Sequence, residues 1–128
     1  MRFKASVVLL LLLMQAGTAS ADSGKAKVTG VYSDLTYHKE SGDILGDEVF
    51  LVSSNKGYFV VFQGSQGEPY PPVVVPAKVD GSSVKFVLPL QVDPRGEFQG
   101  TVVDGELVGT FKANGQTLRL KRKPSYWQ

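Results

Sequence analysis

The stretch EFQGTVVDGELVGTFKANGQTLRLKR, residues 97–122, decides the fold class of this chain. Within it, Leu107 and Phe111 lie on one face of an extended chain, and mostly polar residues lie on the other. This period of two is expected for half-buried antiparallel strands. The Asp-Gly dipeptide at 104 and the Asn-Gly dipeptide at 114 tolerate positive φ, as tight hairpins require. The stretch therefore predicts a meander of short strands.

Short apolar runs separated by turn residues extend over most of the chain, and no helix-length period of 3.6 residues occurs. A meander of about eight strands tends to close on itself, because closure removes its two edges. We therefore expect an all-β fold, a small antiparallel up-and-down barrel, with a β-sandwich as the alternative. The expected strands are residues 26–33, 48–53, 58–63, 73–79, 84–88, 97–103, 106–112 and 116–122.

Two stretches, residues 34–47 and 64–72, are predicted to be connections because they are polar or rich in proline and glycine. The expected strands 48–53 and 58–63 are apolar on both faces. We expect their outer sides to lie under the long connection 34–47. The inward candidates are large and apolar, which favours a filled interior over a cavity for one small ligand.

The N-terminus has the order of a secretory signal peptide. Arg2 and Lys4 precede an apolar run at 7–14, and the small residues Ala19-Ser20-Ala21 form an A-x-A cleavage pattern. This run is far shorter than the roughly 20 apolar residues that a transmembrane helix needs, so no membrane span is expected. Residues 1–21 are thus predicted to be cleaved after Ala21, which directs the protein to the periplasm or the exterior.

The remaining chain, residues 22–128, is predicted to be one domain that relies on its core, because it contains no cysteine. Arg2 and Lys4 leave with the signal, so 12 basic and 12 acidic residues remain. Nucleic-acid binding, which needs an excess of Lys and Arg, is therefore not expected. We expect a monomer without a cofactor.

Catalytic and metal-binding side chains are scarce. His38 is the only histidine and there is no cysteine, which argues against Ser-His hydrolysis and against zinc or copper. Calcium is the alternative metal, with Asp43, Asp47 and Glu48 as ligands, although a solvated acidic loop explains these residues better. Carboxylate-based hydrolysis is left open, because any chain with this many acids contains pairs of them.

The C-terminus combines basic and aromatic residues, with Arg122 close to Tyr126 and Trp127. Such pairings hold anionic polymers or single-stranded nucleic acid. We favour a structural interpretation, in which the last strand has a charged outer face and Trp127 covers one end of the barrel. Tyr70, within a proline-rich loop, is the other exposed aromatic candidate. The candidate ligand or partner surface is thus Tyr70, Arg122, Tyr126 and Trp127.

Two resemblances rest on specific residues. Most of residues 22–128 resembles a group of short exported bacterial proteins that carry no assigned activity. The resemblance rests on Ser41-Gly42-Asp43 with Gly46, Glu48-Val49, Gly57-Tyr58, Pro71-Pro72-Val73 and the ending Arg122 to Gln128. A hairpin module near the C-terminus resembles small lipocalin-like (calycin-like) barrels, which are found alone or fused to exported hydrolases. Its pattern is Phe98-x-Gly100-Thr101, Leu107-x-Gly109-Thr110-Phe111 and Gly115-x-x-Leu118-x-Leu120. These resemblances imply a fold, and no functional residue is carried over from them.

Three functions are therefore compared. The first is a non-enzymatic binding module of the cell envelope, which takes a small apolar ligand inside the barrel or an envelope protein on its surface. The second is an inhibitor of an exported hydrolase that presents the loop 64–72. The third is a small carboxylate-dependent hydrolase that uses acids of residues 34–48. The lack of catalytic groups favours the first.

Overall fold

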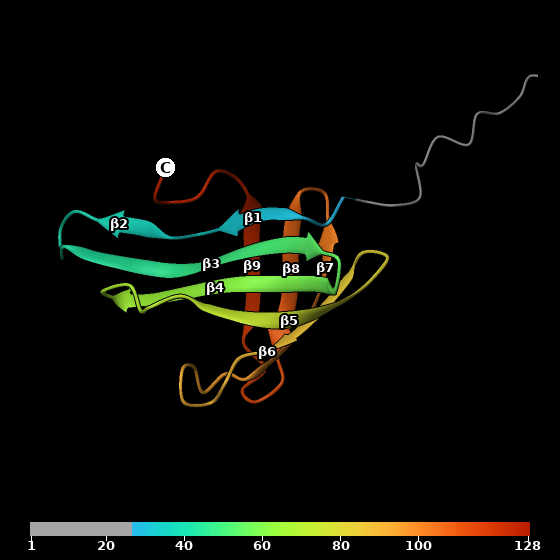
Figure 1. Ribbon diagram of the computed structural model, residues 1–128. Coiled ribbons are helices and arrows are strands. Elements are labelled where there is room, and N and C mark those ends of the chain that lie inside the picture. Colours follow the sequence, from blue (N-terminus) through green and yellow to red (C-terminus); the bar gives the residue numbers. More distant parts are fainter. Residues whose placement is uncertain (1–26) are drawn as a thin grey trace, which may run out of the picture.

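The computed structural model describes residues 27–128, so the predicted signal peptide lies outside the described residues. Within this described part of the chain, nine antiparallel strands follow one another, and most are joined by short turns (Figure 1). They are β1 (Gly30–Ser33), β2 (Thr36–His38), β3 (Asp43–Ser54), β4 (Gly57–Gly67), β5 (Val73–Asp80), β6 (Ser83–Val87), β7 (Glu97–Val103), β8 (Glu106–Phe111) and β9 (Thr117–Arg122).

The sheet closes because β1 pairs with β9 on one side and with β3 on the other. β2 continues β1 along the same partner strand, with Ser33 opposite Glu48 and Thr36 opposite Leu45. The fold is therefore a closed eight-stranded barrel with β2 as an added strand, which confirms the predicted up-and-down barrel. The β-sandwich alternative is wrong, since a continuous ladder of hydrogen bonds encircles the molecule. In Figure 1, β3, β4 and β5 cross in front of β7, β8 and β9.

The interior is occupied by a cluster of buried apolar side chains. Four phenylalanines form a chain of ring contacts through it, with centroid distances of 6.2 Å for Phe62–Phe86, 4.8 Å for Phe86–Phe98 and 5.3 Å for Phe98–Phe111. Phe98 lies directly opposite Phe86 on one neighbouring strand and Phe111 on the other, so the register itself aligns these rings. Aromatic pairs in such tilted or offset arrangements add to the stability that area burial provides.

The strands of residues 97–122 lie close to their predicted positions, and the turn between β7 and β8 has positive φ at both Asp104 and Gly105, as expected. The prediction was wrong for residues 34–47, which contain β2 and the start of β3. It was also wrong for residues 64–67, which extend β4. All three residues of β2 are exposed, so this strand buries neither face and shows no alternating pattern.

The first strand was predicted over residues 26–33 but begins at Gly30, so the prediction was wrong for residues 27–29, and residue 26 lies outside the described residues. The backbone carbonyls of Lys27 and Thr29 accept hydrogen bonds from the Arg122 side chain, so they are satisfied without a neighbouring strand. Among residues 27–128, no helix has the length and apolar character needed to cross a bilayer.

Candidate functional site

The C-terminal residues after β9 are fixed against the outer side of the barrel. Glu48 of β3 accepts hydrogen bonds from the Ser125 hydroxyl and from the Tyr126 backbone N–H, both at 2.8 Å. Successive residues of a strand point to opposite faces, so Glu48 points outward where Val49 points into the core. The expectation that Trp127 covers an end of the barrel is wrong, because these bonds hold the segment on the outer wall.

Gln63 connects two of the predicted surface aromatics. Its Oε1 accepts the Trp127 indole N–H at 2.7 Å, and its Nε2 donates to the Tyr70 carbonyl at 2.8 Å. The indole can only donate and the carbonyl can only accept, so the two contacts fix the orientation of the amide. The Tyr126 and Trp127 rings meet edge to face, with centroids 5.0 Å apart. The structure thus brings Tyr70, Tyr126 and Trp127 together around a residue that the sequence analysis did not single out.

Beside these residues lies a groove of about 480 Å³, which we call the outer groove. Phe50 and Val61 lie directly opposite each other in its wall, and Trp127 forms part of another wall. Phe50 is 41% exposed and Trp127 57% exposed, so two large apolar side chains face solvent there.

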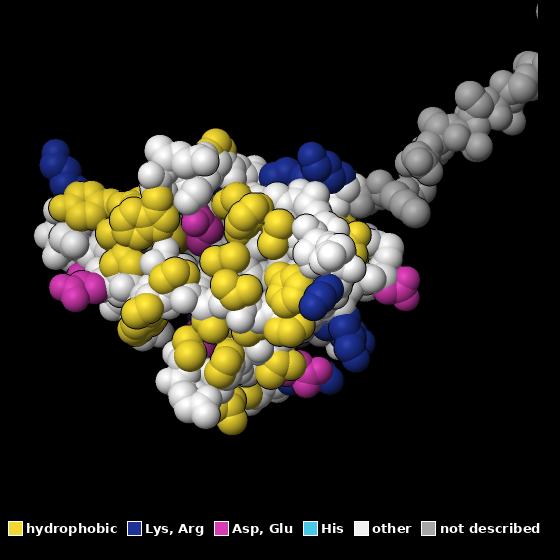
Figure 2. Space-filling model, in the orientation of Figure 1, with side chains coloured by type: hydrophobic (Ala, Val, Ile, Leu, Met, Phe, Trp, Pro, Cys, Tyr) yellow, Lys and Arg dark blue, Asp and Glu magenta, His cyan; other side chains and the backbone are white. Residues whose placement is uncertain are grey.

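Hydrophobic side chains gather over β3, β4 and β5 on this face (Figure 2). The outer sides of β3 and β4 are therefore bordered by the C-terminal segment, and the expectation that residues 34–47 cover them is wrong. The groove is lined by Val31, Glu48, Phe50, Val61, Gln63, Pro72, Ser125 and Trp127.

Arg122, the fourth predicted surface residue, does not line the outer groove. Its guanidinium donates to the Thr29 carbonyl at 2.9 Å and to the Tyr32 hydroxyl at 2.6 Å, and it lies 5.0 Å from the centre of the Tyr32 ring. Burial raises the pKa of Tyr32, and the nearby Arg122 charge offsets only part of this increase. The contacts of Arg122 therefore serve the junction between β1 and β9.

The predicted calcium ligands do not converge. Asp47 and Glu48 are neighbours in β3 and point to opposite faces, while Asp43 is the first residue of that strand. Among residues 27–128, no group of three or more His, Cys, Asp or Glu is placed to hold a metal ion. Arg95 contacts both oxygens of Asp47, and the C-terminal segment contacts both oxygens of Glu48. Both carboxylates are thus engaged by other parts of the chain.

A polar cluster that sequence reasoning missed lies at one end of the barrel. Arg95 makes a bidentate ion pair with Asp47, at 2.7 and 3.0 Å, and a second pair with Asp93, at 2.8 Å. The guanidinium also lies 4.6 Å from the centre of the Phe111 ring. Burial alone would lower the pKa of Arg95, but the hydrogen bonds that it donates to Asp47 and Asp93 outweigh this effect and raise the pKa. Arg95 therefore stays protonated and pairs with both acids.

The sequence contained one signal for this cluster. An Asp that accepts a hydrogen bond from the backbone two residues further on is typical of turns, and Asp93 accepts the Arg95 N–H at 3.0 Å. The partner Asp47 is 48 residues away in the sequence, and no local pattern indicates it.

Comparisons with models of known protein families, with curated proteins and with solved structures gave no significant match to this chain.

Proposed function

We propose that this protein is a non-enzymatic binding module of the cell envelope that recognises a protein partner through the outer groove. The observation that carries the proposal is the exposed, apolar outer groove with Trp127 held at its side by Gln63. Exposed apolar patches rimmed by polar groups are typical of interaction surfaces, and Trp is enriched among the residues that dominate binding energy. The signal peptide predicted at residues 1–21 supports the location.

Surface recognition is favoured over a ligand inside the barrel. Phe62, Phe86, Phe98 and Phe111 occupy the interior in mutual contact, and Arg95 stacks on Phe62 and Phe111 at one end. A small ligand would have to displace these rings, at the cost of the packing that stabilises the barrel. A partner on the outer wall requires no such rearrangement.

Photo-crosslinking in an exporting host tests the proposal. Benzoylphenylalanine in place of Phe50 should capture a partner that mass spectrometry identifies, whereas the same residue in place of Thr117, on the outer face of β9, should not. Trp127→Ala should lower capture at position 50 by about tenfold, the loss typical of one dominant interface residue. Tyr37→Ala is the matched control, because Tyr37 is 54% exposed and does not line the outer groove. Equal capture at positions 50 and 117 would contradict the proposal.

Inhibition of an exported hydrolase is the second candidate, and the Tyr70 loop favours it. The Tyr70 N–H donates to the Gly64 carbonyl at 2.9 Å, and its carbonyl accepts from Gln63, yet the side chain is 45% exposed. A loop fixed in this way loses little entropy when it binds. If the captured partner is a hydrolase, Tyr70→Ala should relieve its inhibition in a direct assay. An unchanged inhibition constant would count against this candidate.

A further inference from the structure

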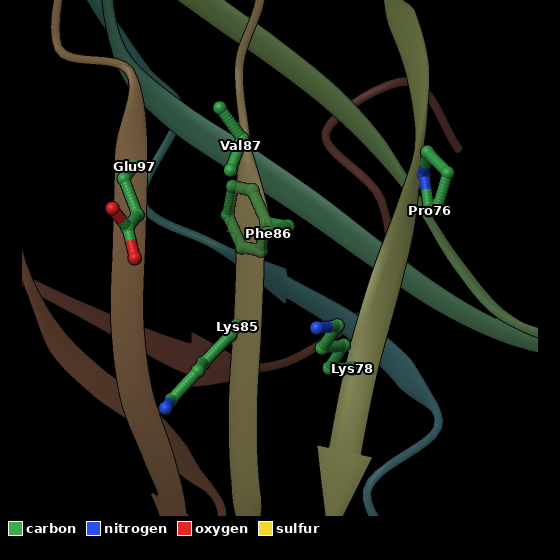
Figure 3. A pocket seen from close by; sticks show the side chains of 6 residues that line it. All are labelled: Pro76, Lys78, Lys85, Phe86, Val87 and Glu97. Carbon is green, nitrogen blue, oxygen red and sulfur yellow. The ribbon is translucent and has the colours of Figure 1, made fainter.

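A second hollow lies on the same outer wall, between β5 and β6 (Figure 3). It has a volume of about 430 Å³ and is lined by Pro76, Lys78, Lys85, Phe86, Val87 and Glu97. Lys78 and Lys85 lie directly opposite each other in the ladder, so both side chains project from the same face. We call this hollow the lysine pocket.

The two lysines carry charge that the described part of the chain does not neutralise. Neither forms a salt bridge within residues 27–128, although Asp80 lies on the same strand as Lys78. Glu97, the acid at the rim, instead pairs with Lys112 at 3.1 Å. Like charges directly opposite each other in adjacent strands are destabilising. An external anion between the two ammonium groups would remove this repulsion.

The lysine pocket and the outer groove lie on neighbouring strands of the barrel. Val61 in the groove wall lies directly opposite Val74 of β5, and Pro76 of the lysine pocket follows two residues along that strand. Val74 is 62% exposed and Val87 59% exposed. Exposed apolar side chains of β5 and β6 therefore lie on the same outer wall as the two lysines.

We propose that the lysine pocket receives an acidic side chain of a polypeptide partner whose neighbouring apolar residues cover Val74 and Val87. This inference rests on the proposed function and names the chemistry of the partner. A polypeptide is favoured over a free small molecule because the pocket is open, whereas small-ligand sites bury most of their ligand. It is favoured over an anionic membrane surface because such surfaces are recognised by larger clusters of Lys and Arg, and only two lysines line this pocket.

A matched pair of peptides tests the inference. The probes are acetylated and amidated Phe-Val-Glu-Val and Phe-Val-Gln-Val, titrated into the exported, isotope-labelled protein and followed by backbone amide shifts. The Glu peptide should shift the amides of Lys78, Lys85 and Val87 and should bind about fivefold more tightly than the Gln peptide, the size expected for two exposed ion pairs. Lys78→Gln with Lys85→Gln should remove this preference. Lys121→Gln, on the outer face of β9, should keep it.

Equal affinity for the two peptides, or a preference that survives in the Lys78→Gln/Lys85→Gln variant, would overturn the inference. Sedimentation with phosphatidylglycerol vesicles is the second arm. Lysine-dependent sedimentation would assign the pocket to a membrane surface and would also overturn it. Crosslinking at position 50 does not depend on these lysines, so a captured partner without peptide discrimination would leave the proposed function standing and refute only this inference.

Discussion

Arg95 pairs with two acids at one end of the barrel: Asp93 in its own turn, and Asp47, which is 48 residues away. Its side chain is 14% exposed and the Asp47 side chain 9% exposed, so the pair is shielded from water. Removing one partner of a buried ion pair leaves an uncompensated charge, which costs far more than the pair itself contributes. The position of Arg95 over the Phe62 and Phe111 rings makes its aliphatic stem part of the interior as well.

We predict that Arg95→Met lowers the free energy of unfolding by about 3–5 kcal/mol, because Asp47 and Asp93 then face each other without a cation. Urea titration followed by circular dichroism measures this. Arg119→Gln is the control, since Arg119 is 62% exposed in its pair with Glu106. It should change the stability by less than about 1 kcal/mol. Similar losses for the two variants would show that burial does not set the strength of the Arg95 pairs.

The Arg95 cluster also predicts how the free energy of unfolding depends on pH. Burial alone would raise the pKa of Asp93, but hydrogen bonds from the Arg95 side chain and backbone outweigh it and hold this pKa below its usual value. A carboxyl with a depressed pKa stabilises the fold above its unfolded value, about 3.9, and this contribution is lost as the pH falls through the folded value. The stability difference between the natural chain and Arg95→Met should therefore shrink below about pH 4. Parallel pH profiles would contradict this assignment.

The C-terminal segment and β3 stabilise each other through Glu48. This carboxylate is 9% exposed, and its two hydrogen bonds come from Ser125 and Tyr126. A buried acceptor that loses its partners incurs the full cost of its lost hydration. The segment is therefore part of the folded barrel and fixes Trp127 at the outer groove.

Removal of residues 125–128 should lower the free energy of unfolding by about 1–3 kcal/mol, because the two hydrogen bonds that anchor the segment to the Glu48 carboxylate are lost. Circular dichroism is the suitable measurement, since the truncation removes the only tryptophan. Ser125→Ala in the full-length chain is the matched variant: it removes one donor while the segment still covers Glu48, and it should lose only part of this stability. A truncated chain as stable as the natural one would show that the segment is not anchored.

Closure of the whole barrel depends on a short seam. β1 and β9 share only the pairs Tyr32–Arg122 and Ser33–Lys121, whereas β3 and β4 pair along most of their length. The Arg122 side chain stabilises this junction, because it donates hydrogen bonds to the carbonyls of Lys27 and Thr29 and to the Tyr32 hydroxyl. Sheet edges that lose their partner expose unpaired backbone groups.

Arg122→Gln should lower the free energy of unfolding by about 1–2 kcal/mol, because one charged donor group serves several acceptors at the seam. Hydrogen exchange followed by mass spectrometry should show β1 and β9 exchanging about tenfold faster, with β4 and β5 changing less, as expected when the weakest junction opens first. If Arg122→Gln leaves exchange unchanged and abolishes partner capture, the sequence-based interpretation of Arg122 as a binding residue holds instead.

Which parts of the fold could be predicted depended on burial. The strands of residues 97–122 alternate because one face packs on the core, and Leu107, Phe111, Leu118 and Leu120 are all buried. In the hairpin of β2 and the start of β3, Thr36, Tyr37 and His38 are all exposed. A segment that buries neither face carries no periodic signal, so composition made it look like a loop.

The binding surface was predictable only in part. Tyr70, Tyr126 and Trp127 could be named because they follow or flank prolines outside any strand pattern, but nothing local indicated that Gln63 would hold Tyr70 and Trp127 together. Lys78 and Lys85 each fit an ordinary alternating strand, and only the register of β5 against β6 places them opposite each other. The lysine pocket could therefore be recognised only from the pairing of β5 with β6 and not from the amino-acid composition.

The sequence by itself determined the all-β class, most strand positions and the turn chemistry, because these depend on contacts between residues near each other along the chain. The tertiary structure decided the closure of the barrel, the Arg95–Asp47 pair and the outer wall that carries the outer groove and the lysine pocket. These features join residues far apart in the chain, and strand register sets which side chains meet. A one-residue shift in register would turn every side chain of a strand to the other face.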